Sequence, residues 1–357
     1  MTRDNALCFP SLEAIRSASA TGPIAAVDLG SNSFRLEIAR FEGGRYRHLE
    51  TLKESVLLGC GLDPRGVLAE AAMQRGLACL ERFARRIEDF GCRQVRAVAT
   101  QALREAVNRE AFLQAGTGVL GHPIEVISGH EEARLIYAGV AGLSPAEGRR
   151  RLVVDIGGRS TEMILGEGRT ALRAESFPIG CGNLSARFFP SGRFTRAGFR
   201  AAQAAAEAAL RGARDAFASG DRDEALGSSG TVHTVSQLLS AQGVTDGALT
   251  TDGLHWCVER CIEAGSAAAL ELAGLKENRR EMLGGGLALL AALLECFDIG
   301  RLRPTPGELR QGLIFELAAC VPAPPASRAP EAGRHEALRP PQPRPAAGAA
   351  LSQAAGT

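Results

Sequence analysis

Aromatic side chains make up only 5% of the 357 residues, no long block of basic residues occurs, and the formal net charge is +1. Nucleic-acid-binding proteins combine basic surfaces with aromatic side chains on which bases stack, so we expect no nucleic-acid partner. No apolar run reaches the length of a membrane span. The longest candidate, residues 283–297, is interrupted at Gly284, Gly285 and Gly286. We therefore expect a buried helix there and no membrane association.

Cysteine is present at nine positions, but no Cys-x-x-Cys pair occurs. Cys257 and Cys261 are one helical turn apart, yet no His or Cys partner is spaced as in a zinc site. Free thiols fit a reducing cytosol. The first 22 residues also lack the apolar centre of a secretory signal. These features predict a cytoplasmic protein.

Residues 152–166 read as a strand, a tight turn and a return strand. The apolar run from Leu152 ends at Asp155. A turn of small residues with free amides and hydroxyls is suited to bind a phosphate. Because a carboxylate repels phosphate unless a cation lies between them, Asp155 and Glu162 indicate a Mg²⁺ ion as well. The candidate phosphate ligands in this turn are Gly157, Gly158, Arg159, Ser160 and Thr161.

The same pattern occurs a second time in residues 24–39. When Asp28 is laid on Asp155, Gly30 falls on Gly157 and Ser33 on Ser160. Two strand–turn–strand units of one design predict two related lobes that each offer a phosphate loop to a shared cleft. The candidate ligands here are Ser31, Asn32 and Ser33 for phosphate and Asp28 for the metal.

A third small, hydroxyl-rich turn precedes a helical pattern within residues 225–239. It contains Ser229, Gly230 and Thr231. A loop at a helix N-terminus presents free amides and a favourable dipole to an anion, so this turn is another candidate phosphate site. An ordinary capped helix is the alternative interpretation.

These three stretches, together with Ser-Gly-His-Glu-Glu-Ala-Arg-Leu-Ile-Tyr at residues 128–137, resemble the exopolyphosphatase / guanosine pentaphosphate phosphohydrolase family. The resemblance covers roughly residues 24–319 and implies an α/β fold with two actin-like, ribonuclease H-like lobes and a central cleft. We expect a flexible extension at 1–22, lobe I at 23–130, lobe II at 131–309, a return to lobe I at 310–321, and a disordered Pro/Ala-rich tail at 322–357.

The resemblance implies release of a terminal phosphate from inorganic polyphosphate or guanosine pentaphosphate. In the family, the glutamate aligned with Glu132 is catalytic, and the arginine aligned with Arg104 binds phosphate. A capping box agrees with this assignment, because Ser128 and Glu131 can satisfy each other at a helix start and leave Glu132 free. Mg²⁺ is implied near Asp28, Asp155 and Glu162.

One position departs from the family pattern. Arg159 stands where the family's loop normally has a third glycine. Arginine pays roughly 1 kcal/mol or more to adopt left-handed backbone angles. We expect the loop to keep its shape, with Arg159 projecting near the phosphates. The alternative is a reshaped loop whose amides turn away.

Two other functions remain open from the sequence. A small-molecule kinase of the same fold would also have phosphate loops, although no sugar-binding motif is visible. A non-catalytic or weakly active sensor of guanosine polyphosphates is the third class. This alternative is favoured by Arg159, because it departs from the family's loop. The sequence leaves the oligomeric state open, including a homodimer.

Overall fold

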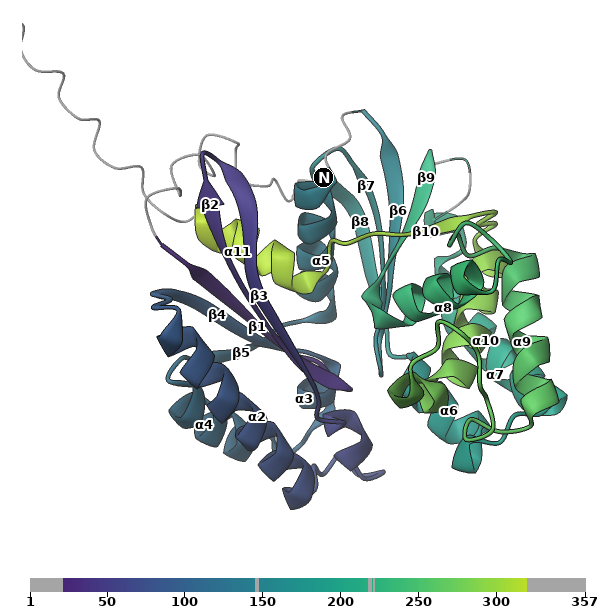
Figure 1. Cartoon of the computed structure of the whole chain (residues 1–357), viewed down its shortest axis with the longest axis horizontal. Coiled ribbons are helices and arrows are strands. Elements are labelled where there is room, and N and C mark those ends of the chain that lie inside the picture. Colours follow the sequence, from purple (N-terminus) through teal and green to yellow (C-terminus); the bar gives the residue numbers. More distant parts are fainter. Residues whose placement is uncertain (1–21, 145–147, 218–219, 221, 320–357) are drawn as a thin grey trace, which may run out of the picture. The chain divides into compact units, whose positions relative to one another are not determined.

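The structure is a computed structural model that describes residues 22–144, 148–217, 220 and 222–319. The predictions of a flexible start and a disordered tail concern residues outside this described part, Gly22 excepted. Within it, two five-stranded mixed sheets and their helices form the body of the chain (Figure 1).

The first sheet has the strand order β3-β2-β1-β4-β5. β1 is central, and its apolar residues are buried on both faces, as expected for a strand covered on each side. It pairs antiparallel with β2 and parallel with β4. The strand bounds are β1 Ile24–Leu29, β2 Ser33–Glu42, β3 Arg45–Ser55, β4 Gln94–Ala99 and β5 Ile124–Val126.

The second sheet repeats this arrangement as β8-β7-β6-β9-β10. β6 is antiparallel to β7 and parallel to β9, as β1 is to β2 and β4. The bounds are β6 Arg150–Ile156, β7 Thr161–Glu167, β8 Thr170–Phe177, β9 Glu224–Ser228 and β10 Leu302–Pro304. The repeated topology confirms the predicted α/β fold with two actin-like lobes.

Ten α-helices of the described residues cover the sheets. Most of these helices begin in one of two places. Some follow a strand that ends at the cleft between the sheets, and others follow a polar residue at the N-cap position. Their bounds are α2 Glu70–Asp89, α3 Gln101–Glu105, α4 Arg109–Leu120, α5 Gly129–Leu143, α6 Cys181–Phe188, α7 Arg196–Leu210, α8 Ser229–Ala241, α9 Thr251–Ala264, α10 Arg280–Cys296 and α11 Leu309–Ala319.

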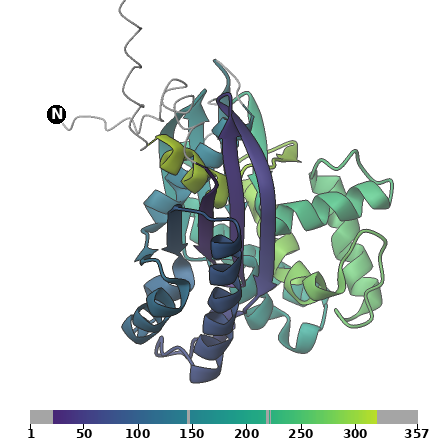
Figure 2. The ribbon, with the colours of Figure 1, turned by 60° about the vertical axis from the view of Figure 1, so that its left-hand side comes forward.

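Three apolar cores hold the layers together. One lies between the first sheet and helices α2 and α4, and one between the second sheet and the helices α6–α10. The third lies between the two sheets, around α5 and α11. Figures 1 and 2 show the green helices on the side of the second sheet that faces away from the purple strands. The cleft is therefore built on a packed layer of two helices.

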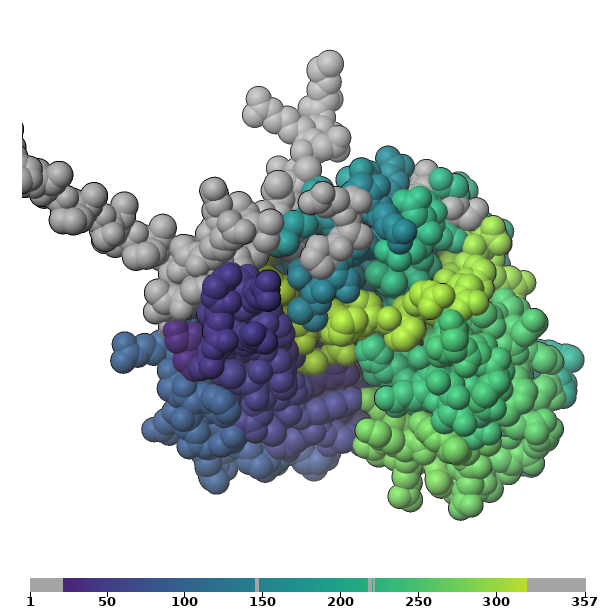
Figure 3. Space-filling model, turned by 45° about the horizontal axis from the view of Figure 1, so that its top comes forward, coloured from purple at the N-terminus to yellow at the C-terminus, as the bar shows by residue number. Residues whose placement is uncertain are grey.

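Helices α5 and α11 approach each other at glycine. A Cβ atom at Gly312 would lie 1.9 Å from the Leu135 carbonyl oxygen, and one at Gly139 would lie 2.1 Å from the Glu308 carbonyl oxygen. Only glycine allows this separation. After β10 the chain thus crosses from the second sheet to α11, which packs against β1, β2 and β4 (Figure 3, yellow).

The apolar segment near residue 290 is a buried helix, as predicted. Helix α10 has eleven buried residues, among them the three consecutive glycines. Among the described residues, no helix is long and apolar enough to cross a membrane.

Candidate active site

A small pocket of about 90 Å³ lies where the two sheets and helix α8 meet. It is lined by the turn after β1, the turn after β6 and the first turn of α8. The structure brings together here twelve of the predicted site residues, namely Asp28, Ser31, Asn32, Ser33, Glu132, Asp155, Gly157, Gly158, Ser160, Ser229, Gly230 and Thr231.

The two strand–turn–strand units have equivalent registers. Asp28 pairs across the strands with Arg35, and Asp155 pairs with Glu162. One lobe therefore carries a cation at the position where the other carries a carboxylate. The two turns also touch, because a Cβ atom at Gly158 would lie 2.4 Å from Asn32 Oδ1.

The α8 turn is strained where it enters the pocket. Ser229 has a φ of 93°, which side chains rarely adopt. Thr231 Oγ1 donates to the Ile156 carbonyl at 3.2 Å, and Ser228 Oγ donates to the Gly307 carbonyl at 2.9 Å. These bonds fix the helix N-terminus with its free amides beside the pocket, which favours an anion there.

The two neighbouring glutamates have different environments. Ser128 Oγ accepts from the Glu131 amide at 3.1 Å, which confirms the predicted cap, while the Glu131 carboxylate pairs with Arg134 rather than returning to the Ser128 amide. Glu132 is 7% exposed and lines the pocket. The cap thus directs Glu132 toward the site.

Arg104 contacts the glutamate instead of lining the pocket. Its Nη1 donates to Glu132 Oε2 at 2.8 Å and to the Ile127 carbonyl at 2.9 Å. Its Nε and Nη2 donate to Gln101 Oε1. In this arrangement Arg104 orients Glu132, and its predicted contact with phosphate stays a prediction.

Arg159 does not enter the pocket. It is not among the described non-glycine residues with positive φ, so the predicted backbone strain is wrong. Its Nε donates to Glu105 Oε2 at 2.8 Å, and its Nη1 donates to the Gly59 carbonyl at 3.3 Å. Because Glu105 and Gly59 belong to lobe I, the side chain spans the cleft. The expectation that Arg159 projects near the phosphates is corrected accordingly.

Two further predicted ligands lie behind the pocket wall. Thr161 is fully buried, and its Oγ1 donates to the Ile179 carbonyl at 2.6 Å, so the hydroxyl is already used. Glu162 is 1% exposed and accepts from Ser176 Oγ at 2.8 Å. Both side chains stabilise the turn rather than face the pocket in this structure.

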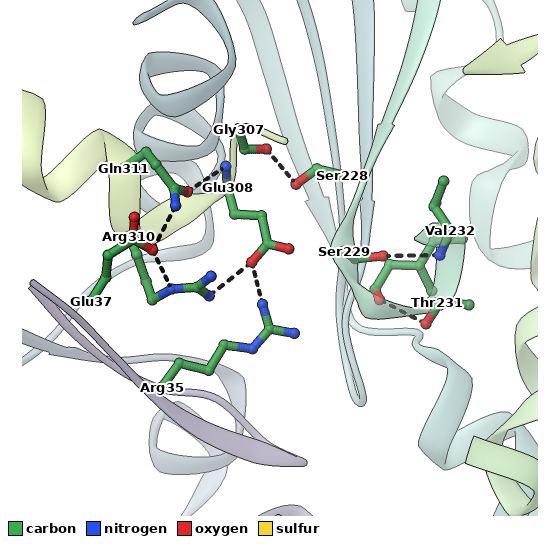
Figure 4. A network of polar contacts seen from close by, with 11 residues as sticks. Arg35, Glu37, Ser228, Ser229, Thr231, Val232, Gly307, Glu308, Arg310 and Gln311 are labelled. Carbon is green, nitrogen blue, oxygen red and sulfur yellow. Dashed lines mark hydrogen bonds and ion pairs between the residues drawn. The ribbon is translucent and has the colours of Figure 1, made fainter. Parts of the chain in front are cut away.

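Sequence reasoning missed three charged residues that line the pocket, Arg35, Arg279 and Glu308. Arg35 could have been found, because it occupies the repeat position of Glu162. Glu308 forms an ion pair with Arg35 and accepts from Arg310 Nη1 at 2.8 Å (Figure 4). Burial alone would raise the pKa of Glu308, but Arg35 and Arg310 outweigh it and hold that pKa at about 2.

The other acidic groups are shifted in the opposite direction. Burial raises the pKa of Asp155 to about 6, with Glu308 adding to the effect. Burial also raises the pKa of Glu132 to about 7, against the opposing effect of Arg104. Glu162 has a raised pKa through burial and through the carboxylates of Glu132 and Asp155. A shared cation would relieve this repulsion.

The residues fit a divalent cation, although they are not a preformed cage. No group of three His, Cys, Asp or Glu side chains in the described part of the chain is arranged as a metal site. Asp28 Oδ1, however, is buried without any hydrogen-bond partner. A buried carboxylate oxygen without a partner is costly unless a cation or water satisfies it. Hard oxygen ligands of this kind suit Mg²⁺.

Comparison with known proteins identifies the family of the chain. The model of the Ppx/GppA phosphatase family matches residues 37–320. The chain belongs to this family. A Haemophilus influenzae protein whose exopolyphosphatase name is provisional is 39% identical over 82% of this chain and 91% of its own length.

Other relatives are longer or have solved structures. The guanosine-5'-triphosphate,3'-diphosphate pyrophosphatase of Pseudoalteromonas atlantica is 40% identical over 82% of this chain, which spans only 58% of that protein. The crystal structure of an exopolyphosphatase from Cytophaga hutchinsonii has a TM-score of 0.76 at 25% identity, covering 84% of this chain and 99% of that one.

Proposed function

We propose that this protein is a phosphohydrolase that releases the terminal phosphate of inorganic polyphosphate. The observation that carries the proposal is the position of Glu132, a buried carboxylate that lines the same pocket as all three phosphate loops. A carboxylate whose pKa lies near 7 is suited to accept a proton from water at neutral pH.

The pocket supplies what phosphoryl transfer needs, namely positioning and charge neutralisation. The amides and hydroxyls of the two turns and of the α8 N-terminus hold the terminal phosphoryl oxygens. Asp28 and Asp155, with Glu162 behind them, would hold Mg²⁺, which neutralises developing charge when bound. Water attacks the terminal phosphorus while Glu132 takes its proton, and the bridging P–O bond breaks to leave a shortened chain.

Guanosine pentaphosphate is the second candidate substrate. It is favoured by the 40% identity to proteins that are named as pyrophosphatases of this nucleotide. It presents the same terminal phosphoanhydride to the pocket. The sensor and kinase alternatives predict, respectively, binding without turnover and phosphorylation of a small molecule by ATP.

The deciding experiment is phosphate release from polyphosphate, guanosine pentaphosphate and ATP, with Mg²⁺ and with a chelator. We expect Mg²⁺-dependent release from polyphosphate. Glu132→Gln should lower kcat by roughly 10²–10⁴-fold, because it removes the base but keeps the side-chain size.

The matched control is Glu131→Gln on the adjacent residue, whose carboxylate pairs with Arg134 outside the pocket, and this variant should keep nearly full activity. Equal losses from both variants, or tight nucleotide binding without turnover by the unmodified protein, would exclude the proposed role of Glu132.

A further inference from the structure

The phosphate pocket continues into a second hollow between the lobes. This inner hollow has a volume of about 220 Å³ and shares Arg35, Gly230, Arg279 and Glu308 with the pocket. Another hollow of about 470 Å³, called the outer hollow here, also adjoins the pocket and shares Asn32, Ser33 and Arg279 with it. A chain whose end occupies the pocket can therefore extend along the cleft.

Both lysines of the protein line these hollows. The chain has 41 basic residues, but only Lys53 and Lys276 are lysines. Both lysine side chains line the inner hollow, and both also line the outer hollow. Lys53 lies on β3 in lobe I, and Lys276 precedes the 3₁₀ turn Glu277–Arg279 in lobe II. The two ammonium groups thus approach the same path from opposite lobes.

The inner hollow carries an excess of positive charge. Beside the two lysines it is lined by Arg35, Arg279 and Arg310. Its one described acidic side chain, Glu308, is already paired with Arg35 and Arg310. Loss of solvent inside the cleft lowers the pKa of Lys53 to about 7, and Arg35 and Arg279 add to the effect. The outer hollow is more balanced, because Glu277 and Glu281 also line it.

Lysine and arginine hold phosphate differently. Arginine offers a rigid fork that binds two oxygens of one group, whereas lysine is a compact charge on a flexible stem. A chain that must advance by one phosphate after each cleavage requires contacts that release easily. Lysine meets that requirement in a protein that otherwise uses arginine.

The pocket and the two hollows lack the large aromatic side chains on which bases usually stack, although His233 lines the inner hollow. None of the described residues that line the pocket or either hollow is Phe, Tyr or Trp. Stacking on an aromatic ring is the usual means by which proteins hold an unpaired base. The lining therefore suits a chain of repeated phosphates better than a nucleoside.

We propose that Lys53 and Lys276 form a subsite for the inner phosphates of an extended polyphosphate chain whose terminal phosphate occupies the pocket. The proposal rests on the proposed function and makes that function more specific, because it selects a linear polyphosphate over a guanosine nucleotide as the preferred substrate.

The test compares Lys53→Gln, Lys276→Gln and the double variant on tripolyphosphate and on long-chain polyphosphate. We expect the KM for the long chain to rise roughly tenfold per lysine, as expected for the loss of one hydrogen bond between charged groups, with kcat nearly unchanged. The slope of log KM against log salt concentration should fall by about one per lysine. Tripolyphosphate and guanosine pentaphosphate should be less affected.

Two controls make the result specific. Arg85→Gln removes an exposed, ion-paired cation on α2, away from the cleft, and should leave every KM unchanged. Lys53→Arg with Lys276→Arg keeps the charge, so the KM should stay low while kcat on the long chain falls, because each shortened chain is released more slowly. An unchanged long-chain KM in the double glutamine variant overturns the proposal, as does an equal loss with guanosine pentaphosphate.

A binding measurement separates this proposal from the function on which it rests. Direct binding of long-chain polyphosphate is measured in the Glu132→Gln background, with and without the lysine substitutions. If the unmodified protein releases no phosphate, the proposed function fails, while the binding data still decide whether the lysines form the subsite.

Discussion

Arg159 has a structural role that its position in a phosphate loop did not suggest. Its guanidinium joins the turn after β6 to Glu105 and to the Gly59 carbonyl in lobe I. The two ion-paired side chains are 27% and 30% exposed, so solvent screens the pair. Exposed pairs contribute about 0.2–1 kcal/mol, which is a small bias toward the closed cleft.

The corresponding prediction is that Arg159→Gly and Glu105→Gln change activity in the same direction. Each should raise the KM by about two- to fivefold, since each removes the same contact across the cleft. The double variant should be no worse than either single variant. If Arg159 instead bound substrate, Glu105→Gln would free it and lower the KM. Steady-state kinetics on polyphosphate decide between the two.

The buried carboxylates predict an unusual pH dependence of stability. The pKa of Asp155 is about 6 and that of Glu132 about 7 in the folded protein, above their values in an unfolded chain. The folded state then binds more protons than the unfolded state between about pH 4 and 7, so stability falls as pH rises through this window.

In a chelator, the melting temperature should therefore decrease from pH 5 to pH 7.5. Stabilisation by Mg²⁺ should grow over the same range, because the cation requires deprotonated ligands. Asp155→Asn should flatten both trends. Stabilisation by Mg²⁺ that is larger at pH 5 than at pH 7.5 would contradict the assignment of Asp155 as one of its ligands.

The local part of the site could be predicted from the sequence, and the long-range part could not. The short motifs that contain Asp28, Asp155 and the turn residues predict their roles through the spacing of the residues. The cap at Ser128 distinguishes Glu132 from Glu131. Arg35 and Glu308 are 273 residues apart, so their pairing depends on the fold. The position of Arg159 could not be predicted because its partner, Glu105, lies in the other lobe.

At the scale of elements, the repeat of two sheets follows from apolar strands that flank two matching turns. The layer between the sheets was not predictable in the same way. Helices α5 and α11 meet there through glycines, and no periodic pattern in the sequence indicates a contact between two helices whose nearest ends, Leu143 and Leu309, are 166 residues apart. The requirement for glycine at each of these positions becomes clear only when the backbone that packs against it is known.

The helix contact predicts a selective sensitivity to added volume. In Gly312→Ala, the new Cβ would meet the Leu135 carbonyl oxygen, so the two helices must separate. We expect a loss of roughly 1–3 kcal/mol or more, seen in denaturant unfolding. Gly118→Ala on α4 is the control, because nothing lies within 4 Å of its Cβ. It should be neutral or stabilising by up to about 1 kcal/mol, and equal effects would refute the packing argument.

At the scale of the whole body, residues 22–319, the pocket exists only because parts of both lobes meet. Asp28 and Asn32 come from the first sheet, and Asp155 and Gly158 come from the second. The Asn32 side chain lies against Gly158, and Arg159 reaches lobe I beside it. In the described structure the two turns are therefore close enough to hold one phosphoryl group between them.

This arrangement predicts that added volume at the contact between the turns impairs closure without unfolding either lobe. A Cβ at Gly158 would lie within 2.4–2.6 Å of three Asn32 side-chain atoms. Gly158→Ala should therefore lower kcat on polyphosphate by about tenfold or more, because a misplacement of about 1 Å at a reacting centre can cost 10²-fold. The melting temperature should change little, since the contact lies outside the apolar cores.

The decisive comparison is a double-mutant cycle with Asn32→Ala, which removes the obstructing atoms. Asn32→Ala alone should lower activity, because Asn32 is a candidate phosphate ligand. In that background, Gly158→Ala should cost less than about threefold, because the space is now available, and the two losses should not multiply. If Gly158→Ala is as harmful without the asparagine as with it, the contact does not limit closure. The glycine would then be required for the shape of its own turn, and closure would depend on Arg159 and Glu105 instead.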